Sequence, residues 1–89
     1  MTNKTTEDYL KAIYQADADQ RGAGTTELAE RLGIAPASVT GMLKKLAAQE
    51  LVTYTRYQGV ALTDTGRVIA LDVLRRHRLA ERYLTDVLG

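Results

Sequence analysis

Two side chains near the C-terminal end of the sequence have the types and spacing of a metal-binding pair. His77 is the only histidine in the chain, and Glu81 follows it by four positions in a segment without proline. Four residues make about one helical turn, so the imidazole and the carboxylate could face one ion. Asp8 could add an oxygen if the first and last helices pack together. A divalent transition metal in a nitrogen and oxygen site usually takes roughly four to six donors, so these groups leave the site incomplete.

The residues alone leave a simpler interpretation open for all three side chains. A histidine and a glutamate four residues apart are often neighbours on a helix surface, with no metal between them. An acid such as Asp8 near the start of a helix stabilises the positive end of the helix dipole. The chain has no Ser-His-Asp grouping, phosphate loop or HExxH motif, and one histidine cannot supply the ligands of a catalytic metal, so we expect no enzyme.

A second group of residues has the character of a nucleic-acid contact surface. Small or hydroxylated side chains between Ala35 and Gly41 would permit close approach to base edges, and the lysines and arginine that follow could neutralise phosphates. The alternative is that the small residues reflect helix capping and propensity, and that the lysines are only solvated. The candidate contact residues are Thr26, Ala35, Pro36, Ala37, Ser38, Thr40, Gly41, Lys44, Lys45, Arg56, Tyr57 and Gln58.

Helical periodicity and capping residues predict three helices in the first 50 residues. Thr5 or Thr6 is expected to cap the first, which ends before a polar stretch with two glycines at 17–24. Thr26 is expected to cap a short second helix that closes at Gly33. After a three-residue turn, Pro36 suits the first position of a third helix that should end near residue 50.

A hairpin and a long helix are predicted for the rest of the chain. The segment LVTYTRYQGVAL is rich in β-branched and aromatic residues and is split by Gln58 and Gly59, which is typical of two strands and a turn. Thr63 can cap a fourth helix that runs from Asp64 almost to the last residue. Its apolar residues form a wider band than a small core needs, which indicates a partner surface or a missing domain.

This order of elements predicts the fold and a division of the chain. Helix, three-residue turn, helix and hairpin make a winged helix-turn-helix, a mainly α fold with a small β-hairpin. Its second helix can enter the major groove of double-stranded DNA. We expect residues 1–63 to form the DNA-binding domain and residues 64–89 a helix that leads to a dimerisation and metal-binding domain absent from the chain.

Composition and charge are consistent with one small domain. The 89 residues are 45% hydrophobic and 26% charged, with no cysteine and therefore no disulfide or thiolate metal site. Residues 1–30 hold six acids and three bases, whereas residues 31–89 hold five acids and nine bases, so a polyanion should meet the later part. There is no signal peptide or apolar run long enough to span a membrane, and a cytoplasmic location is expected.

Four segments together resemble the metal-dependent repressors of the diphtheria toxin repressor and manganese transport regulator family. They are TTEDYLKAIY, LAERLGIAPASVTGMLKKL, LVTYTRYQGVALTDTGR and RRHRLAERYLTDVLG, and they cover nearly the whole chain. The resemblance implies a homodimeric, metal-activated repressor that binds palindromic operators near metal-uptake genes. It implies a recognition helix at Pro36 to Lys45 and a wing tip at Tyr57 to Gly59. It also makes Asp8 a ligand of the regulatory metal, and His77 and Glu81 ligands at a second, neighbouring metal position.

The sequence departs from the family pattern in ways that affect the metal. Members complete these sites with a helix that follows the fourth, and the chain stops before it, so weak metal binding and weak dimerisation are expected here. Some members have methionine where this chain has Asp8, and a carboxylate suits Mn²⁺, with Fe²⁺ close in preference. Manganese-type members have an acid three residues later, where this chain has Lys11. The alternative function is a winged-helix protein-interaction module without a metal response.

Overall fold

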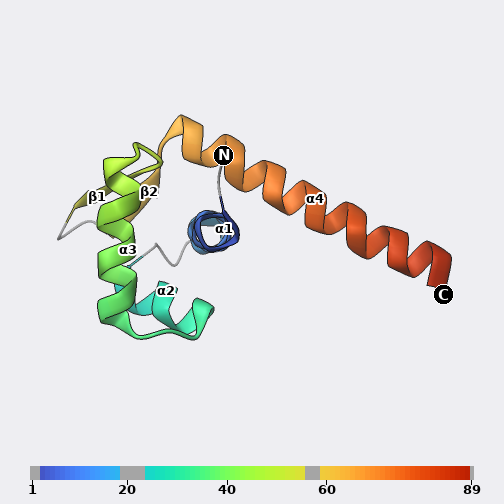
Figure 1. Cartoon of the computed structure of the whole chain (residues 1–89), viewed down its shortest axis with the longest axis horizontal. Coiled ribbons are helices and arrows are strands. Elements are labelled where there is room, and N and C mark those ends of the chain that lie inside the picture. The colour runs from blue at the N-terminus through green and yellow to red at the C-terminus, as the bar shows by residue number, and fades with distance from the viewer. Residues whose placement is uncertain (1–2, 19–23, 56–58, 89) are drawn as a thin grey trace.

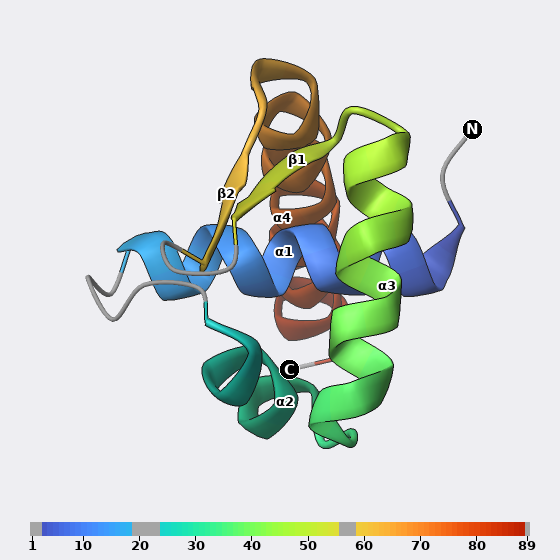
Figure 2. The same cartoon turned by 90° about the vertical axis from the view of Figure 1, so that its left-hand side faces the viewer.

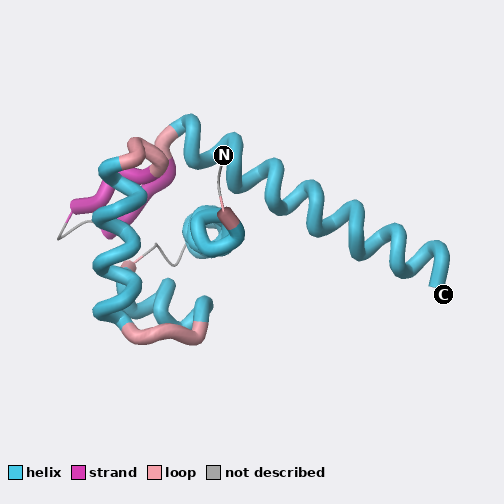
Figure 3. Tube along the Cα trace, in the orientation of Figure 1, coloured by secondary structure: helices cyan, strands magenta, loops and turns pink. Residues whose placement is uncertain are grey.

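The computed structural model has four helices and one hairpin, in the order predicted from the sequence (Figures 1 and 3). It describes residues 3–18, 24–55 and 59–88, and the side chains of residues 18 and 80–88 are not described. The fold is therefore a winged helix-turn-helix, mainly α with a small sheet. The elements are α1 (Lys4–Ala18), α2 (Thr25–Leu32), α3 (Pro36–Ala48), β1 (Val52–Thr55), β2 (Gly59–Leu62) and α4 (Asp64–Leu88).

The core lies around α1, which crosses between α4 on one side and α2 and α3 on the other (Figures 1 and 2). The apolar spacing of α1 places Leu10 and Ile13 inward, and both are almost fully buried. From α2 and α3 come further buried residues at helical spacing, and the hairpin and α4 close the rest. The largest fully buried side chains are Leu10, Ile13, Leu28, Val39, Leu43, Leu46 and Val73.

The caps predicted for the first two helices are wrong. Asn3 caps α1, because its Oδ1 accepts a hydrogen bond of 2.8 Å from the backbone N of Thr6, and the helix begins at Lys4. Thr6 is buried in the first turn instead. At α2 the N-cap is Gly24, with no side-chain hydrogen bond, and Thr26 lies inside the helix. Several polar residues precede each helix, and the local pattern does not say which one adopts the extended backbone of a cap.

The turn between α2 and α3 is the three-residue connection that the sequence predicts. Gly33 follows α2 with a φ of 69°, a left-handed conformation that glycine adopts without a steric cost. The backbone N–H groups of Gly33 and Ile34 both donate to the carbonyl of Ala29, which closes the end of α2. Pro36 occupies the first turn of α3, as predicted, because its missing N–H is not needed there.

The third helix ends two residues earlier than expected and leads directly into the hairpin. Ala48 is its last residue, and Glu50 has a φ of 60°, which turns the chain so that the N–H of Leu51 donates to the carbonyl of Leu46. The strands then pair antiparallel, with Val52 opposite Leu62 and Thr55 opposite Gly59. The predicted two-stranded wing is therefore confirmed in its strands, whereas its tip at residues 56–58 lies outside the described residues.

Thr63 caps α4, as predicted, and also ties this helix to the end of α3. Its hydroxyl accepts a hydrogen bond of 3.0 Å from the N–H of Gly66. The same hydroxyl is 2.8 Å from the carbonyl of Glu50 and 3.0 Å from that of Leu51, either of which can accept its proton. A Cβ on Gly66 would clash with the Leu51 carbonyl oxygen, so only glycine fits at this contact. The short motif from Leu62 to Gly66 is thus a joint between wing and helix.

The fourth helix extends well past the body of the domain (Figure 1). Its 25 residues correspond to about 37 Å at 1.5 Å per residue. Ala70 and Val73 are buried against the core, whereas Val68, Leu71 and Leu79 are 67%, 45% and 57% exposed. The surplus of apolar residues predicted for this helix is confirmed among the described side chains. No helix within the described ranges is both long and apolar enough to cross a lipid bilayer.

Candidate nucleic-acid interface and metal-linked residues

The N-terminal half of α3 and the turn before it form an exposed surface of small side chains. The inward face of α3 is set by Val39, Leu43 and Leu46, which are fully buried. Because these three residues anchor the helix to the core, the opposite face must point to solvent. The exposed candidates on that face are Ala35, Pro36, Ala37, Ser38, Gly41, Lys44 and Lys45. The structure therefore places these seven predicted residues together on one surface.

Two positions in the middle of this surface differ in what they offer a ligand. Thr40 is half-buried, and its hydroxyl donates to the carbonyl of Pro36 at 3.2 Å, so it offers its acceptor lone pairs more readily than its proton. Gly41 is exposed, and a Cβ there would meet no other described atom within 4 Å. Nothing inside the described fold therefore requires glycine at position 41.

The remaining predicted contact residues are Thr26 and three residues of the wing. Thr26 is exposed in the first turn of α2, the helix that packs beside α3. Exposed Lys44 and Lys45 lie one turn beyond Gly41 and carry the positive charge of α3. The predicted wing residues Arg56, Tyr57 and Gln58 lie outside the described residues. Since phosphates attract ammonium groups at any base sequence, the two lysines would position DNA without reading it.

Asp8 lies between α1 and the end of α2. Its side chain is half-buried, and no hydrogen bond or ion pair joins it to the described residues. It lines a hollow of about 200 Å³ with Lys11, Arg31 and Leu32, and a second hollow of similar size that reaches Ile34 in the turn before α3. A half-buried carboxylate without a described partner has the chemistry of a ligand for a hard cation.

His77 faces α1, but a lysine lies against it. The Nζ of Lys11 is 3.3 Å from the Nδ1 of the His77 imidazole, and an ammonium group can only donate, so the ring nitrogen accepts. Lys11 also lines the first of the two hollows beside Asp8, so its side chain borders that hollow and contacts His77. Glu81 belongs to α4, but its side chain lies outside the described residues.

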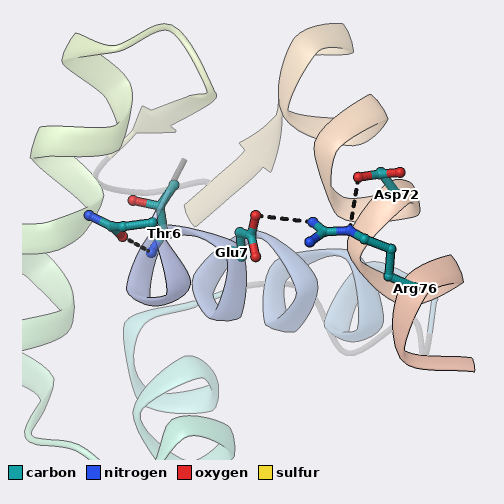
Figure 4. A network of polar contacts seen from close by, with 5 residues as sticks. Thr6, Glu7, Asp72 and Arg76 are labelled. Carbon is teal, nitrogen blue, oxygen red and sulfur yellow. Dashed lines mark hydrogen bonds and ion pairs between the residues drawn. The ribbon is translucent and has the colours of Figure 1, made fainter. Parts of the chain in front are cut away.

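A second polar contact joins the same two helices one residue away (Figure 4). The guanidinium of Arg76 donates to Glu7 at 3.0 Å and to Asp72 at 3.1 Å, from α4 to α1 and within α4 respectively. The hydrogen bond and the charge of Glu7, followed by those of Asp72, raise the pKa of Arg76. Because the Arg76 side chain is 53% exposed, water screens this network and its contribution to stability is small.

The described side chains would surround an ion differently at the two predicted metal positions. Asp8 can serve as one ligand of the first position. At the second position, the ammonium of Lys11 lies where a cation would approach the Nδ1 of His77. Within the described residues, no three histidine, cysteine or acidic side chains are grouped closely enough to hold a metal. The described side chains therefore offer one ligand to a first site, and at the second they place an ammonium against the Nδ1 of His77.

Some of these features have no clear signal in the sequence. The pairing of Lys11 with His77 and of Arg76 with Glu7 depends on which faces of α1 and α4 meet. The partners are 66 and 69 positions apart, so no local pattern indicates these contacts. A signal did exist for Lys11, since it follows Asp8 at a helical spacing of three and so shares a face with it. The Asn3 cap could have been found from the preference of asparagine for that position.

Comparison with known proteins gives a consistent set of relatives. Residues 1–60 match the family model "Iron dependent repressor, N-terminal DNA binding domain". Residues 63–89 match "Iron dependent repressor, metal binding and dimerisation domain". The HTH-type transcriptional regulator MntR of Bacillus subtilis (strain 168) is 37% identical over 84 residues, which are 94% of this chain and 59% of that protein.

Two further relatives extend the comparison. The diphtheria toxin repressor of Corynebacterium jeikeium (strain K411) is 38% identical over 85 residues, which are 96% of this chain and 35% of that protein. A solved structure of the manganese regulator SloR superposes with a TM-score of 0.79 and 34% identity, over 99% of this chain and 40% of that one. The chain thus spans little more than half the length of the Bacillus protein and less of the other two.

Proposed function

The chain belongs to the iron dependent repressor family, and from that premise we propose that it is the DNA-binding part of a metal-dependent transcriptional repressor of metal-homeostasis genes. Residues 1–63 would bind an operator in double-stranded DNA, and α4 would connect them to a dimerisation and metal-binding domain. Two copies in a homodimer would then meet the two halves of the operator. The role is regulation rather than catalysis, and a repressor bound to the bacterial chromosome works in the cytoplasm.

The exposed face of α3 is the observation that carries this proposal. Its small side chains from Ala35 to Gly41 leave room for a groove, and Lys44 and Lys45 supply charge for phosphates at the next turn. The buried residues of the opposite face hold α3 firmly, so it can enter the groove as a rigid unit. The wing residues Arg56, Tyr57 and Gln58, together with Thr26 at the start of α2, would add contacts to the backbone beside it.

A titration across salt tests the DNA-binding role. The chain would be titrated with a duplex selected from a randomised pool and with an unrelated duplex of equal length, between 50 and 200 mM salt. We expect tighter binding to the selected duplex and a steep loss of affinity as salt rises. A matched variant, Arg67→Ala, removes a charge from α4 outside the proposed contact surface and should bind like wild type. Equal affinity for both duplexes with a flat salt response would contradict the proposal.

The proposed regulatory ion is Mn²⁺ or Fe²⁺, with Asp8 as one of its ligands. When bound, such an ion supplies positive charge that carboxylate oxygens neutralise. The half-buried side chain of Asp8 lines a hollow with Leu32 and Ile34, so an ion held there would lie beside the end of α2 and the turn before α3. Since Asp8, His77 and Glu81 offer fewer donors than a divalent ion needs, the chain alone should bind Mn²⁺ weakly in calorimetry. Tight stoichiometric binding that His77→Ala abolishes would contradict this incomplete site.

A second candidate function rests on the exposed apolar residues of α4. Val68 and Leu71 are 67% and 45% exposed, and Leu79 continues the same helix. A winged helix can use such a surface to bind another protein, without DNA and without a metal response. A partner retained on the chain at high salt, released by Leu71→Ser, together with no binding to any duplex, would favour this function over the first.

A further inference from the structure

Where α1 crosses α4, the ammonium of Lys11 lies beside the imidazole of His77. The Nζ of Lys11 lies 3.3 Å from the Nδ1 of His77, which is the distance of a hydrogen bond between an ammonium and a ring nitrogen. The lone pair of Nδ1 is the one with which this nitrogen could bind a metal, and here it accepts from lysine. The Lys11 side chain is half-buried, so the ammonium is carried to this place by a partly packed stem.

The charges around His77 also disfavour a second ion. Arg75, Arg76 and Arg78 flank it in the chain and are exposed. The carboxylates of Glu7 and Asp72, which come from the two crossing helices, already accept hydrogen bonds from Arg76. A divalent ion at the Nδ1 of His77 would meet the Lys11 ammonium at hydrogen-bond distance, and repulsion between like charges at such close range is costly even in water.

Lys11 and Arg31 line a hollow together with Asp8, and Arg31 donates to Glu27. Asp8 nevertheless differs from His77, because no described side chain donates to its carboxylate. It lies on the neighbouring face of α1, its carboxylate has no partner within the described part of the chain, and it lines a hollow rather than a filled contact. Lys11 follows it by three residues and lines the same hollow, and its ammonium reaches the Nδ1 of His77.

We propose that the Lys11 ammonium takes the place of a metal ion at the second metal position. The regulator then binds one divalent ion per subunit, with Asp8 among its ligands. The contact of Lys11 with His77 then joins α1 to α4 without a second metal. This inference rests on the proposed function as a metal-dependent repressor, since it concerns how many ions that repressor takes.

His77 makes the proposal testable because it is the only histidine of the chain. Its two ring ¹⁵N resonances can be followed by NMR during titration with ZnCl₂, a diamagnetic probe for a divalent ion. In Lys11→Glu a carboxylate replaces the ammonium, and we expect the Zn²⁺ concentration that half-shifts the His77 resonances to fall at least tenfold. Without metal, Lys11→Gln should already shift the Nδ1 resonance, because its hydrogen-bond donor changes.

Controls separate a specific site from a general charge effect. Arg67→Glu reverses one charge on the same helix, about ten residues from His77, and should change the half-shift concentration less than twofold. Backbone spectra of Lys11→Glu and Lys11→Gln establish that both variants keep the fold, and Lys11→Gln carries the test if Lys11→Glu does not fold. Its expected result is a fall below the wild-type half-shift concentration by more than the twofold allowed for Arg67→Glu, since it removes repulsion without adding a ligand.

Three results would overturn the proposal. One is a His77 resonance in wild type that responds to Zn²⁺ at the same concentration as in Lys11→Glu. Another is a Nδ1 resonance that does not change in metal-free Lys11→Gln. The third is an equal fall for Arg67→Glu. None of these measurements involves DNA. A negative DNA titration would therefore reject the proposed function, whereas the effect of Lys11 on Zn²⁺ binding at His77 could still be interpreted.

Discussion

Gly41 gives the most direct test of how α3 is used, because its effects on stability and on DNA binding should oppose each other. It lies within a helix of 13 residues, where glycine is less favourable than alanine by about 0.8–1.0 kcal/mol. A Cβ at this position would meet no other described atom within 4 Å, so alanine introduces no clash. Gly41→Ala should therefore raise the free energy of unfolding by about 0.5–1 kcal/mol.

The same methyl group should weaken DNA binding. If glycine is present because a base or a sugar approaches the helix closely, a Cβ pushes the groove away and loosens the contacts on either side. Loss of one base contact costs about 1–3 kcal/mol, and tenfold in affinity corresponds to about 1.4 kcal/mol. We expect Gly41→Ala to bind the selected duplex about tenfold more weakly, with an unchanged salt slope because the lysines remain.

Urea unfolding followed by circular dichroism measures the first effect, and fluorescence anisotropy with the labelled duplex measures the second. For a domain of this size, about 1 kcal/mol corresponds to a rise of roughly 4–8 °C in Tm. Thr65→Ala, at an exposed position in the first turn of α4, is a control that alters helix propensity away from α3 and should leave DNA affinity unchanged. If Gly41→Ala keeps the affinity of wild type, DNA does not approach the helix closely at this position. If Gly41→Ala is less stable than wild type, a Cβ at position 41 does not lie in open space.

The other predictions concern the joint between wing and α4, and the charges. Gly66→Ala should destabilise the chain by about 2 kcal/mol or more in urea unfolding, because its Cβ meets the Leu51 carbonyl oxygen; a neutral result would show that this joint adjusts freely. Thr63→Ala should lower the free energy of unfolding by about 1–2 kcal/mol, because the N-terminal cap of α4 is lost. A change below about 0.5 kcal/mol would show that the Thr63 hydroxyl does not stabilise this helix. Lys45→Ala should lower affinity for all duplexes alike and reduce the slope of log K against log salt by about one, and a loss confined to one sequence would mean that Lys45 reads bases.

The periodic elements of this fold could be predicted from the sequence because each carries a strong local signal. The apolar spacing in α1 and α3, the proline at the start of α3 and the β-branched segments of the wing all depend on residues close in the chain. Gly33 and Pro36 fix the turn between α2 and α3 in the same local way. The exposed face of α3 then follows, since the residues that are not at core spacing must face outward.

The caps and the contacts between helices could not be predicted in the same way. Asn3, Thr5 and Thr6 are all capable of capping a helix, and the burial of Thr6 in the fold excludes it as the cap. The metal residues depend on how α1 crosses α4, a property of tertiary packing. His77 has the spacing of a ligand pair with Glu81, yet within the described side chains its neighbour is a lysine from the other end of the sequence.

Helix α1 connects the two predicted activities of the domain. Asp8 of α1 lines a hollow with Leu32 and Ile34, at the end of α2 and in the turn that leads into α3. Glu7 and Lys11, from the same helix, contact α4. Because packed helices move as units, a displacement of α1 at Asp8 cannot leave both the turn and the crossing unchanged. If Lys11 already joins α1 to α4, a second ion would add little to the contact between these helices. The response of the repressor to metal would then depend only on the ion bound by Asp8.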